Sequence, residues 1–183
     1  MDSAFIHQAA NELVQNVGTR NIKQIARSCS LDISETSRIR DMLGLLSLYF
    51  DKPLILINHQ LDKQTKQMVC GYALGHYLEH QLLMDLHTLD KFLTIKDKHI
   101  LLYEHNAFTS HLMLDSDEVY QMTKRGLDAA QISAAKRIHL NLVLVKLLEL
   151  HHLGYDLRHY HAQHHAFIKQ LNLPEYYRFD AAG

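Results

Sequence analysis

Hydrophobic residues recur along this chain first with a helical period, then in short strand-like runs, and then with a helical period again. The apolar positions from Ile6 to Val17 keep a 3.6-residue period, which predicts a helix that ends at Gly18. Asn21 can cap a second short helix. Leu31 to Ile33 predicts a short strand, and the polar stretch up to Asp41 predicts a loop.

The middle of the chain alternates between predicted strands and long helices. Leu43 to Phe50 and Pro53 to Asn58 are apolar runs separated by two polar residues, a spacing that favours an antiparallel hairpin. Lys63 to His80 then predicts a central amphipathic helix. Residues 82–99 mix short apolar clusters with charges, which indicates an irregular connection or a short helix, whereas Ile100 to Leu114 predicts a second strong helix.

The remainder of the chain is also helical in pattern. One predicted helix ends at Gly154, and a final helical segment spans His159 to Leu171. Together these patterns predict an α+β fold that is mostly helical, with a small antiparallel sheet packed on the central helix. We expect residues 1–120 to form the main domain and residues 121–183 to form a helical C-terminal extension packed on it.

Composition and charge narrow the classes of function. The chain has 183 residues, of which 47% are hydrophobic, and no run of 18 apolar residues, so we expect a cytoplasmic protein with no membrane partner. The net charge of −1 gives no nucleic-acid footprint. The least supported alternative is DNA contact through four basic residues of the C-terminal part, Lys124, Arg125, Lys136 and Arg137.

The central helix carries the most informative chemistry. In the run MVCGYALGHYLEH, the residues Tyr72, His76 and His80 recur every four positions and therefore lie along one helix face. Zinc peptidases place two imidazoles in this way in the HExxH motif, with the Glu as general base. Here Tyr72 stands where the first His would be and Ala73 where the Glu would be, so the motif is degenerate.

Three segments in the right order resemble the ImmA/IrrE family of metallopeptidases. LINHQLDKQTKQMVCGYALGHYLEH (Leu56 to His80) resembles the family's strand, loop and AHELGHxxLH segment. GTRNIKQIARSCSLDI (Gly18 to Ile33) is similar to its entry helix, and EHNAFTSHLML (Glu104 to Leu114) is similar to its ExxAxxFAxxLLMP helix. The resemblance covers roughly Ile6 to Tyr155 and implies a zincin-like fold.

The resemblance also implies a set of metal ligands. His76 matches the second His of the motif and Glu104 matches the family's third ligand. An alternative register, HxxEH, would use His76 with His80, and would make Glu79 a base if the protein is an active enzyme. His105 could replace His80, although neighbouring helix residues diverge by about 100° and are not expected to reach one ion together. The resulting prediction is no cofactor, or a weakly bound zinc.

A function follows from the resemblance and from the lost motif residues. In peptidases of this type a peptide is held as an added strand at the sheet edge, which makes Leu54, Leu56, Asn58 and Tyr72 the candidates for partner binding. The hypothesis is a catalytically inactive metallopeptidase-like protein of a phage or mobile element that sequesters a regulatory or host-defence protein. The alternative is an active zinc endopeptidase that cleaves a helix-turn-helix repressor, using His76, Glu104 and His80.

The histidine-rich C-terminal segment is a second candidate for interaction. His161 and His165 have the i, i+4 spacing that can chelate a metal, but no carboxylate base is nearby in the sequence. An interface with a partner or with a second copy of the chain is the preferred interpretation, with Tyr155 and Tyr160 supplying contact area.

Overall fold

The protein has the predicted α+β fold, with helices outnumbering strands in the described part of the chain. The computed structural model describes residues 2–50, 52–82, 92–95, 102–157 and 166–171. The described helices are α1 (Ser3–Val17), α2 (Ile22–Ser28), α3 (Lys63–Leu82), α4 (Tyr103–Met113), α5 (Ser116–Lys124), α6 (Ala129–Lys136), α7 (Leu140–His152) and α8 (Ala166–Gln170). The described strands are β1 (Asp32–Thr36), β2 (Gly44–Tyr49), β3 (Lys52–Asn58) and β4 (Phe92–Ile95).

Helix α1 ends at Gly18 and helix α2 begins after Asn21, as the sequence predicts. The side chain of Asp2 accepts a hydrogen bond from the amide of Phe5 at the start of α1, and Gly18 ends the helix with a φ of 74°. The side chain of Asn21 accepts from the amides of Lys23 and Gln24 at the start of α2. These caps satisfy amides that a helix start otherwise leaves without partners.

The sheet has the strand order β1-β3-β2-β4. β2 and β3 form the predicted antiparallel hairpin, but β1 pairs with β3 in parallel, with Asp32 opposite Leu54. The sheet is therefore mixed, and the prediction of a purely antiparallel sheet was wrong in this respect. The segment 92–95, predicted as irregular or helical, is strand β4 because it pairs antiparallel with β2.

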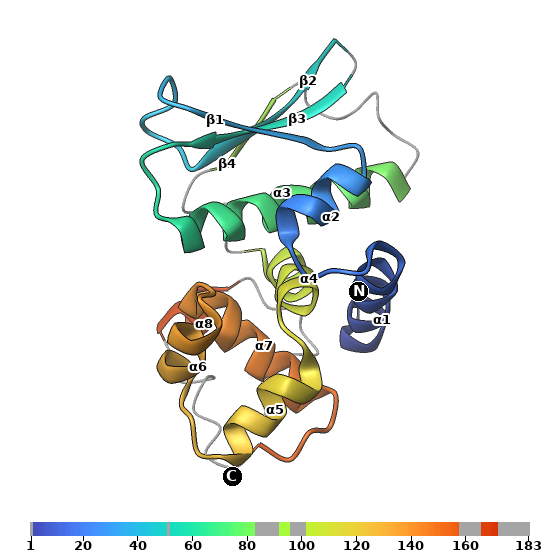
Figure 1. The fold of residues 1–183 in the computed structure, drawn as a ribbon, viewed down its shortest axis with the longest axis vertical. Coiled ribbons are helices and arrows are strands. Elements are labelled where there is room, and N and C mark those ends of the chain that lie inside the picture. Colours follow the sequence, from blue (N-terminus) through green and yellow to red (C-terminus); the bar gives the residue numbers. More distant parts are fainter. Residues whose placement is uncertain (1, 51, 83–91, 96–101, 158–165, 172–183) are drawn as a thin grey trace.

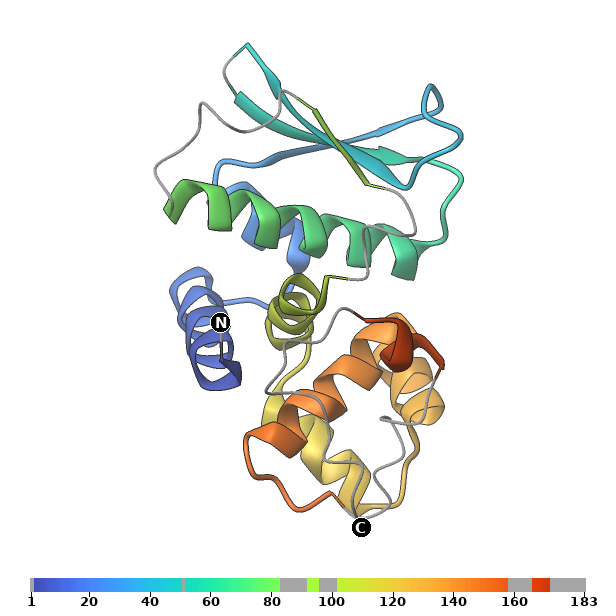
Figure 2. The same cartoon turned by 180° about the vertical axis from the view of Figure 1, so that it is seen from behind.

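One face of the sheet packs on α3. Leu46, Ile55 and Ile57 are fully buried on this face. The contact is so close at Gly44 that an added Cβ atom would lie 2.9 Å from a methyl carbon of Val69 on α3. Figures 1 and 2 show the sheet as an outer layer, and no described helix covers its opposite face.

Helix α4 crosses beneath α3 on the side away from the sheet, so α3 lies between the sheet and the remaining helices (Figure 1). An added Cβ at Gly71 of α3 would lie 2.2 Å from Cγ2 of Thr109 on α4. The missing side chain at this position is therefore what allows the two helices to approach. This crossing brings the motif residues of α3 against α4.

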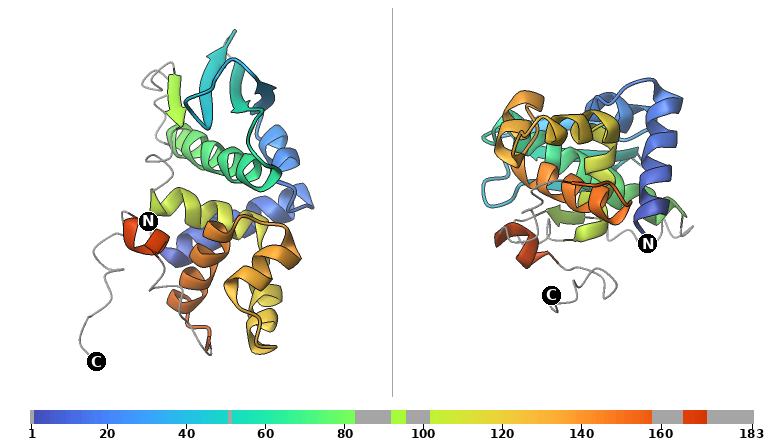
Figure 3. Two further views of the ribbon diagram at one scale, coloured as in Figure 1. Left: turned by 90° about the vertical axis from the view of Figure 1, so that its left-hand side faces the viewer. Right: turned by 90° about the horizontal axis from the view of Figure 1, so that it is seen from below.

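Helices α5 to α7 form a cluster beneath α4, as the side and bottom views show (Figure 3). Helix α7 packs on α4 and is buried from Leu142 to Leu150. In the described residues no helix is long and apolar enough to cross a membrane. The expected domain boundary at residue 120 stays a prediction.

Candidate functional site

Helix α3 places residues 72 and 73 of the predicted motif in the protein interior. Tyr72 is only 2% exposed and Ala73 is fully buried. Burial, helped by the nearby charge of Glu79, raises the pKa of the Tyr72 phenol to about 12, so the phenol stays neutral at physiological pH. A neutral phenol and a methyl group therefore occupy the positions of the first motif histidine and of the general base.

The imidazole of His105 on α4 lies against the motif face of α3. Its ring centroid is 5.1 Å from that of Tyr72 and 5.4 Å from that of His76, and both contacts are edge-to-face. Its Nε2 atom lies 2.8 Å from Oε2 of Glu79. Since a carboxylate can only accept, Nε2 carries the proton and donates it to Glu79.

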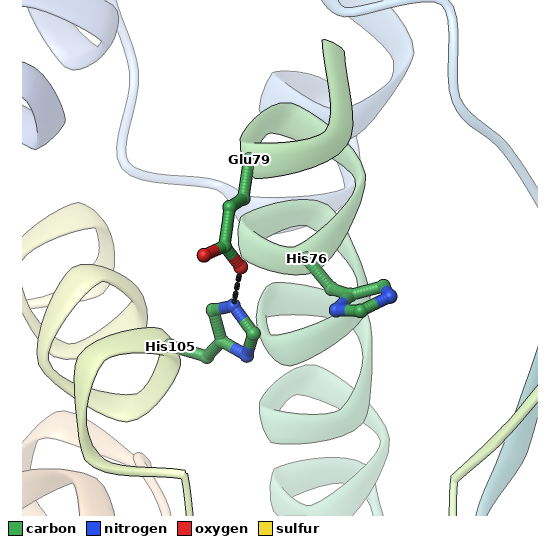
Figure 4. A group of neighbouring side chains, drawn as sticks. All are labelled: His76, Glu79 and His105. Carbon is green, nitrogen blue, oxygen red and sulfur yellow. Dashed lines mark hydrogen bonds and ion pairs between the residues drawn. The ribbon is translucent and has the colours of Figure 1, made fainter. Parts of the chain in front are cut away.

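Three side chains of this site form a group that could hold a metal ion. Ligand atoms of His76, Glu79 and His105 all lie within 4.8 Å of one another (Figure 4). Glu79, the base of the alternative HxxEH register, is bonded to His105, and its side chain is 37% exposed. The sequence had placed His76 and Glu104 together, whereas the structure adds Glu79 and His105 around His76.

Glu104 lies next to His105 in the first turn of α4. It lines a hollow between α1, α3 and α4 together with Glu79 and His105. The other walls are apolar and include Phe5 of α1 and Phe108 of α4. The role of Glu104 as a metal ligand stays a prediction.

The strand predicted to bind a peptide at the sheet edge, β3, lies inside the sheet. β3 is bonded to β1 on one side and to β2 on the other, so it has no free edge for an added strand. Leu54 and Leu56 lie on the sheet face opposite to α3, because they alternate with the buried Ile55 and Ile57. The expectation that β3 is the edge strand that takes up a peptide was therefore wrong.

Asn58 and Tyr72, the other two residues predicted to bind a partner, have roles inside the fold. The side-chain amide of Asn58 donates to the carbonyl of Met42, and its oxygen accepts from the amide of Gln60. Asn58 thus fixes the end of β3 and the approach to β2. Because Asn58 is 5% exposed and Tyr72 is 2% exposed, neither offers surface to a partner.

The C-terminal candidates are only partly described. Tyr155 is half-buried, packs edge-to-face on Tyr120 and donates to Asp117. Tyr160, His161 and His165 lie outside the described residues, as does the side chain of His80. The interface prediction for this segment stays untested.

The basic residues proposed for DNA contact are partly engaged within the chain. Lys124 pairs with Asp156, and Lys136 pairs with Glu118. Each of these two ammonium groups therefore already has an acidic partner within the chain.

A buried polar network below α4 was not anticipated from the sequence. His111 of α4 lies between two charged residues of α7, with Nδ1 2.6 Å from Nζ of Lys146 and Nε2 3.0 Å from Oε2 of Glu149. The other oxygen of Glu149 accepts from Ser3 of α1 and from the hydroxyl of Tyr103. The network therefore connects α1, α4 and α7.

The ionisation states of this network follow from burial and from the hydrogen bonds. Burial lowers the pKa of His111 to about 4 and that of Lys146 to about 7. Burial alone would raise the pKa of Glu149, but hydrogen bonds from His111 and Tyr103 outweigh it, so that pKa is lowered. Near neutral pH a neutral His111 thus bridges an ionised Glu149 and a lysine near its midpoint.

The sequence did contain a signal for this network. Lys146 and Glu149 are charged residues three positions apart in the otherwise apolar run LNLVLVKLLEL. A charge at such a position is either paired or strongly destabilising. The partner, His111, could not be identified without the packing of α4 on α7.

The sheet, the motif helix and the crossing helix are the frame of a metallopeptidase-like protein. The family model for the IrrE N-terminal-like domain, a peptidase family, matches residues 31–148. The chain belongs to this family, which confirms the resemblance found in the sequence. No curated protein is significantly similar to the chain.

The residues of this chain do not fit the zinc that the family motif implies. In the motif register the ion would be held by positions 72, 76 and 104, and the side chain at 73 would be the base. Tyr72 is a buried phenol with a raised pKa, and its ring packs on His105. Ala73 has no proton-accepting group. The motif register therefore lacks both a first ligand and a base.

Proposed function

We propose that this chain is a catalytically inactive, metallopeptidase-like binding protein. The observation that supports the proposal best is the burial of the motif residues Tyr72 and Ala73. His105 packs on Tyr72, on the face of α3 where the motif of an active peptidase would hold its zinc ion. Peptide hydrolysis needs an activated water and a base to take its proton. The motif positions supply neither, so we infer that the fold is kept for binding.

The family resemblance suggests the kind of partner. Members of the ImmA/IrrE family act on helix-turn-helix repressors in phages and mobile elements, and we propose that this chain sequesters such a regulator, or a host-defence protein, without cutting it. The edges of β3 are occupied, so binding by strand addition to β3 is not part of the proposal.

The exposed apolar residues suggest where the partner binds. Tyr49 and Phe50, at the tip of the β2–β3 hairpin, are 63% and 82% exposed and pack edge-to-face on each other. Leu54 and Leu56 lie half-buried on the sheet face that no described helix covers. Aromatic side chains of this kind are enriched among the residues that dominate interface energies.

The proposal is tested with regulators encoded beside the gene for this chain. Each is mixed with the purified protein, with and without a chelator, and complex formation is measured by calorimetry and the partner mass by mass spectrometry. We expect a complex that survives chelation and a partner of unchanged mass. The double substitution Tyr49→Ser and Phe50→Ser should weaken binding by roughly tenfold or more.

A matched control uses Phe5→Ser. Phe5 is also an exposed aromatic residue, 52% exposed, but it lies on α1 rather than on the sheet. We expect this variant to bind like the wild type. Chelator-sensitive cleavage of the partner would contradict the proposal and would favour the alternative, an active endopeptidase that uses His76, Glu104 and His80.

A further inference from the structure

We propose that His76, Glu79 and His105 form a binding site for a divalent transition-metal ion, in a register different from that of the peptidase motif. Two ligands come from successive turns of α3 and the third from α4 (Figure 4). The site is independent of the proposed partner binding, since it lies between α3 and α4 and not on the sheet. It uses neither of the replaced motif residues.

The spacing of the three side chains is close to what a zinc ion requires. Ligand atoms about 2.0–2.1 Å from a tetrahedral zinc stand roughly 3.3 Å from one another. The ligand atoms here lie within 4.8 Å, and the His105–Glu79 pair is already at 2.8 Å. Small side-chain rotations of His76 and Glu79, which are both only partly buried, would complete the approach.

The two ring nitrogens of His105 differ in their surroundings. His105 is 6% exposed, and Nε2 is the nitrogen that faces Glu79. Nε2 is therefore the ligand atom, and Glu79 binds the ion with the oxygen that otherwise accepts the Nε2 proton. In the metal complex His105 is a neutral imidazole with its one proton on Nδ1.

The donor types select the metal. Two imidazoles and one carboxylate suit Zn²⁺, Co²⁺ or Ni²⁺, whereas Mg²⁺ and Ca²⁺ prefer oxygen donors. The Glu79 carboxylate supplies charge that favours a cation, and Glu104 adds a second carboxylate on the wall of the adjoining hollow. Three protein ligands leave a coordination position for water or an external group.

Metal at this site would not restore peptidase chemistry by the motif mechanism. Glu79, which lies in the group with His76 and His105, is itself a metal ligand and so does not act as a base. Ala73 has no proton-accepting group at the position of the general base of the motif. The ion would instead fix α4 against α3, because its ligands come from both helices. Metal binding without proteolysis is therefore the expected combination.

The test is a titration of chelator-treated full-length protein with Co²⁺ and Zn²⁺, followed by calorimetry and by the visible absorption of tetrahedral Co²⁺. The wild type should bind about one ion per chain at this site. Glu79→Gln and His76→Gln should each weaken binding by roughly tenfold or more. Both positions are partly exposed, so these variants should remain folded, which circular dichroism checks.

The matched control is Glu104→Gln, which removes a carboxylate from the wall of the same hollow. It should bind metal within about threefold of the wild type, because it loses only a neighbouring charge. The proposal is overturned if the wild type binds no ion, if Glu104→Gln loses binding while Glu79→Gln keeps it, or if both Glu79→Gln and His76→Gln bind normally. Partner binding is measured separately, so failure here leaves the proposed function untouched.

Discussion

Replacing Gly71 with alanine should destabilise the protein, although the same change in most helices stabilises it. Alanine in a helix interior is favoured over glycine by about 0.5–1 kcal/mol. At Gly71, however, the new Cβ would lie 2.2 Å from Cγ2 and 2.9 Å from Oγ1 of Thr109. Carbon atoms in contact normally stand about 3.5–4.0 Å apart, so the helices must separate or Thr109 must turn.

Thr109 is not free to turn without loss. Its hydroxyl donates to the carbonyl of His105, one turn earlier on α4, at 2.7 Å. Overpacking of this kind costs about 1–3 kcal/mol, which exceeds the gain in helix propensity. We therefore expect Gly71→Ala to lower the free energy of unfolding by about 1–2 kcal/mol.

Gly75 provides the matched comparison on the same helix face. Its added Cβ would lie 3.5 Å from ring carbons of His105 and Phe108, an ordinary contact. Gly75→Ala should therefore raise the free energy of unfolding by about 0.5–1 kcal/mol. Urea denaturation followed by circular dichroism measures both changes as shifts of the midpoint in opposite directions.

The decisive test is the double variant Gly71→Ala/Thr109→Ala. Thr109→Ala removes both the methyl and the hydroxyl group that the new Cβ would meet, so Gly71→Ala should lower the free energy of unfolding less in the Thr109→Ala background than in the wild type. If Gly71→Ala stabilises the protein as much as Gly75→Ala does, the close approach of α3 and α4 is not as the structure has it.

Three further predictions concern the buried charges and the motif. Glu149→Gln should lower the free energy of unfolding by about 3–5 kcal/mol, because it removes the ionised acceptor of Ser3, Tyr103 and His111 in the protein interior. The exposed Glu118→Gln should change it by less than about 1 kcal/mol in the same denaturation assay. Burial lowers the pKa of Lys146 from 10.5 to about 7, so above pH 7 the unfolded chain binds more protons than the folded one, and the free energy of unfolding should rise between about pH 7 and 8.5. Lys146→Met should flatten that rise in pH-dependent unfolding, and an unchanged slope would rule the lysine out. Ala73→Glu should unfold at a lower urea concentration than the wild type, because it places a carboxylate at a fully buried position. Zinc should stabilise the double variant Tyr72→His/Ala73→Glu more than the single variant, which keeps only the group His76, Glu79 and His105. Equal stabilisation of the two variants would refute the motif assignment.

The buried network around Glu149 and the group His76, Glu79 and His105 both include residues of α4. Tyr103 and His111 tie α4 to Glu149 of α7, while His105 meets α3 from the same helix. The position of His105 relative to α3 therefore depends on contacts along both sides of α4. Substitutions in the network that leave the protein folded are expected to affect the geometry of the site only through α4.

The sequence by itself determined the elements whose signals are local. The end of α1 at Gly18, the start of α2 at Asn21 and the β2–β3 hairpin follow from caps, turns and periodicity. The family was also readable from the order of residues along the chain. Such features depend on neighbours a few positions away.

Only the tertiary structure decided the features that depend on distant partners. The parallel pairing of β1 with β3 and the strand β4 require partners far away in sequence, and a strand of four residues has almost no signal of its own. The contact of His105 with Tyr72 and His76 was set by how α4 is rotated about its axis. That rotation is fixed by the close approach at Gly71 and by the bonds to Glu149, which no local pattern encodes.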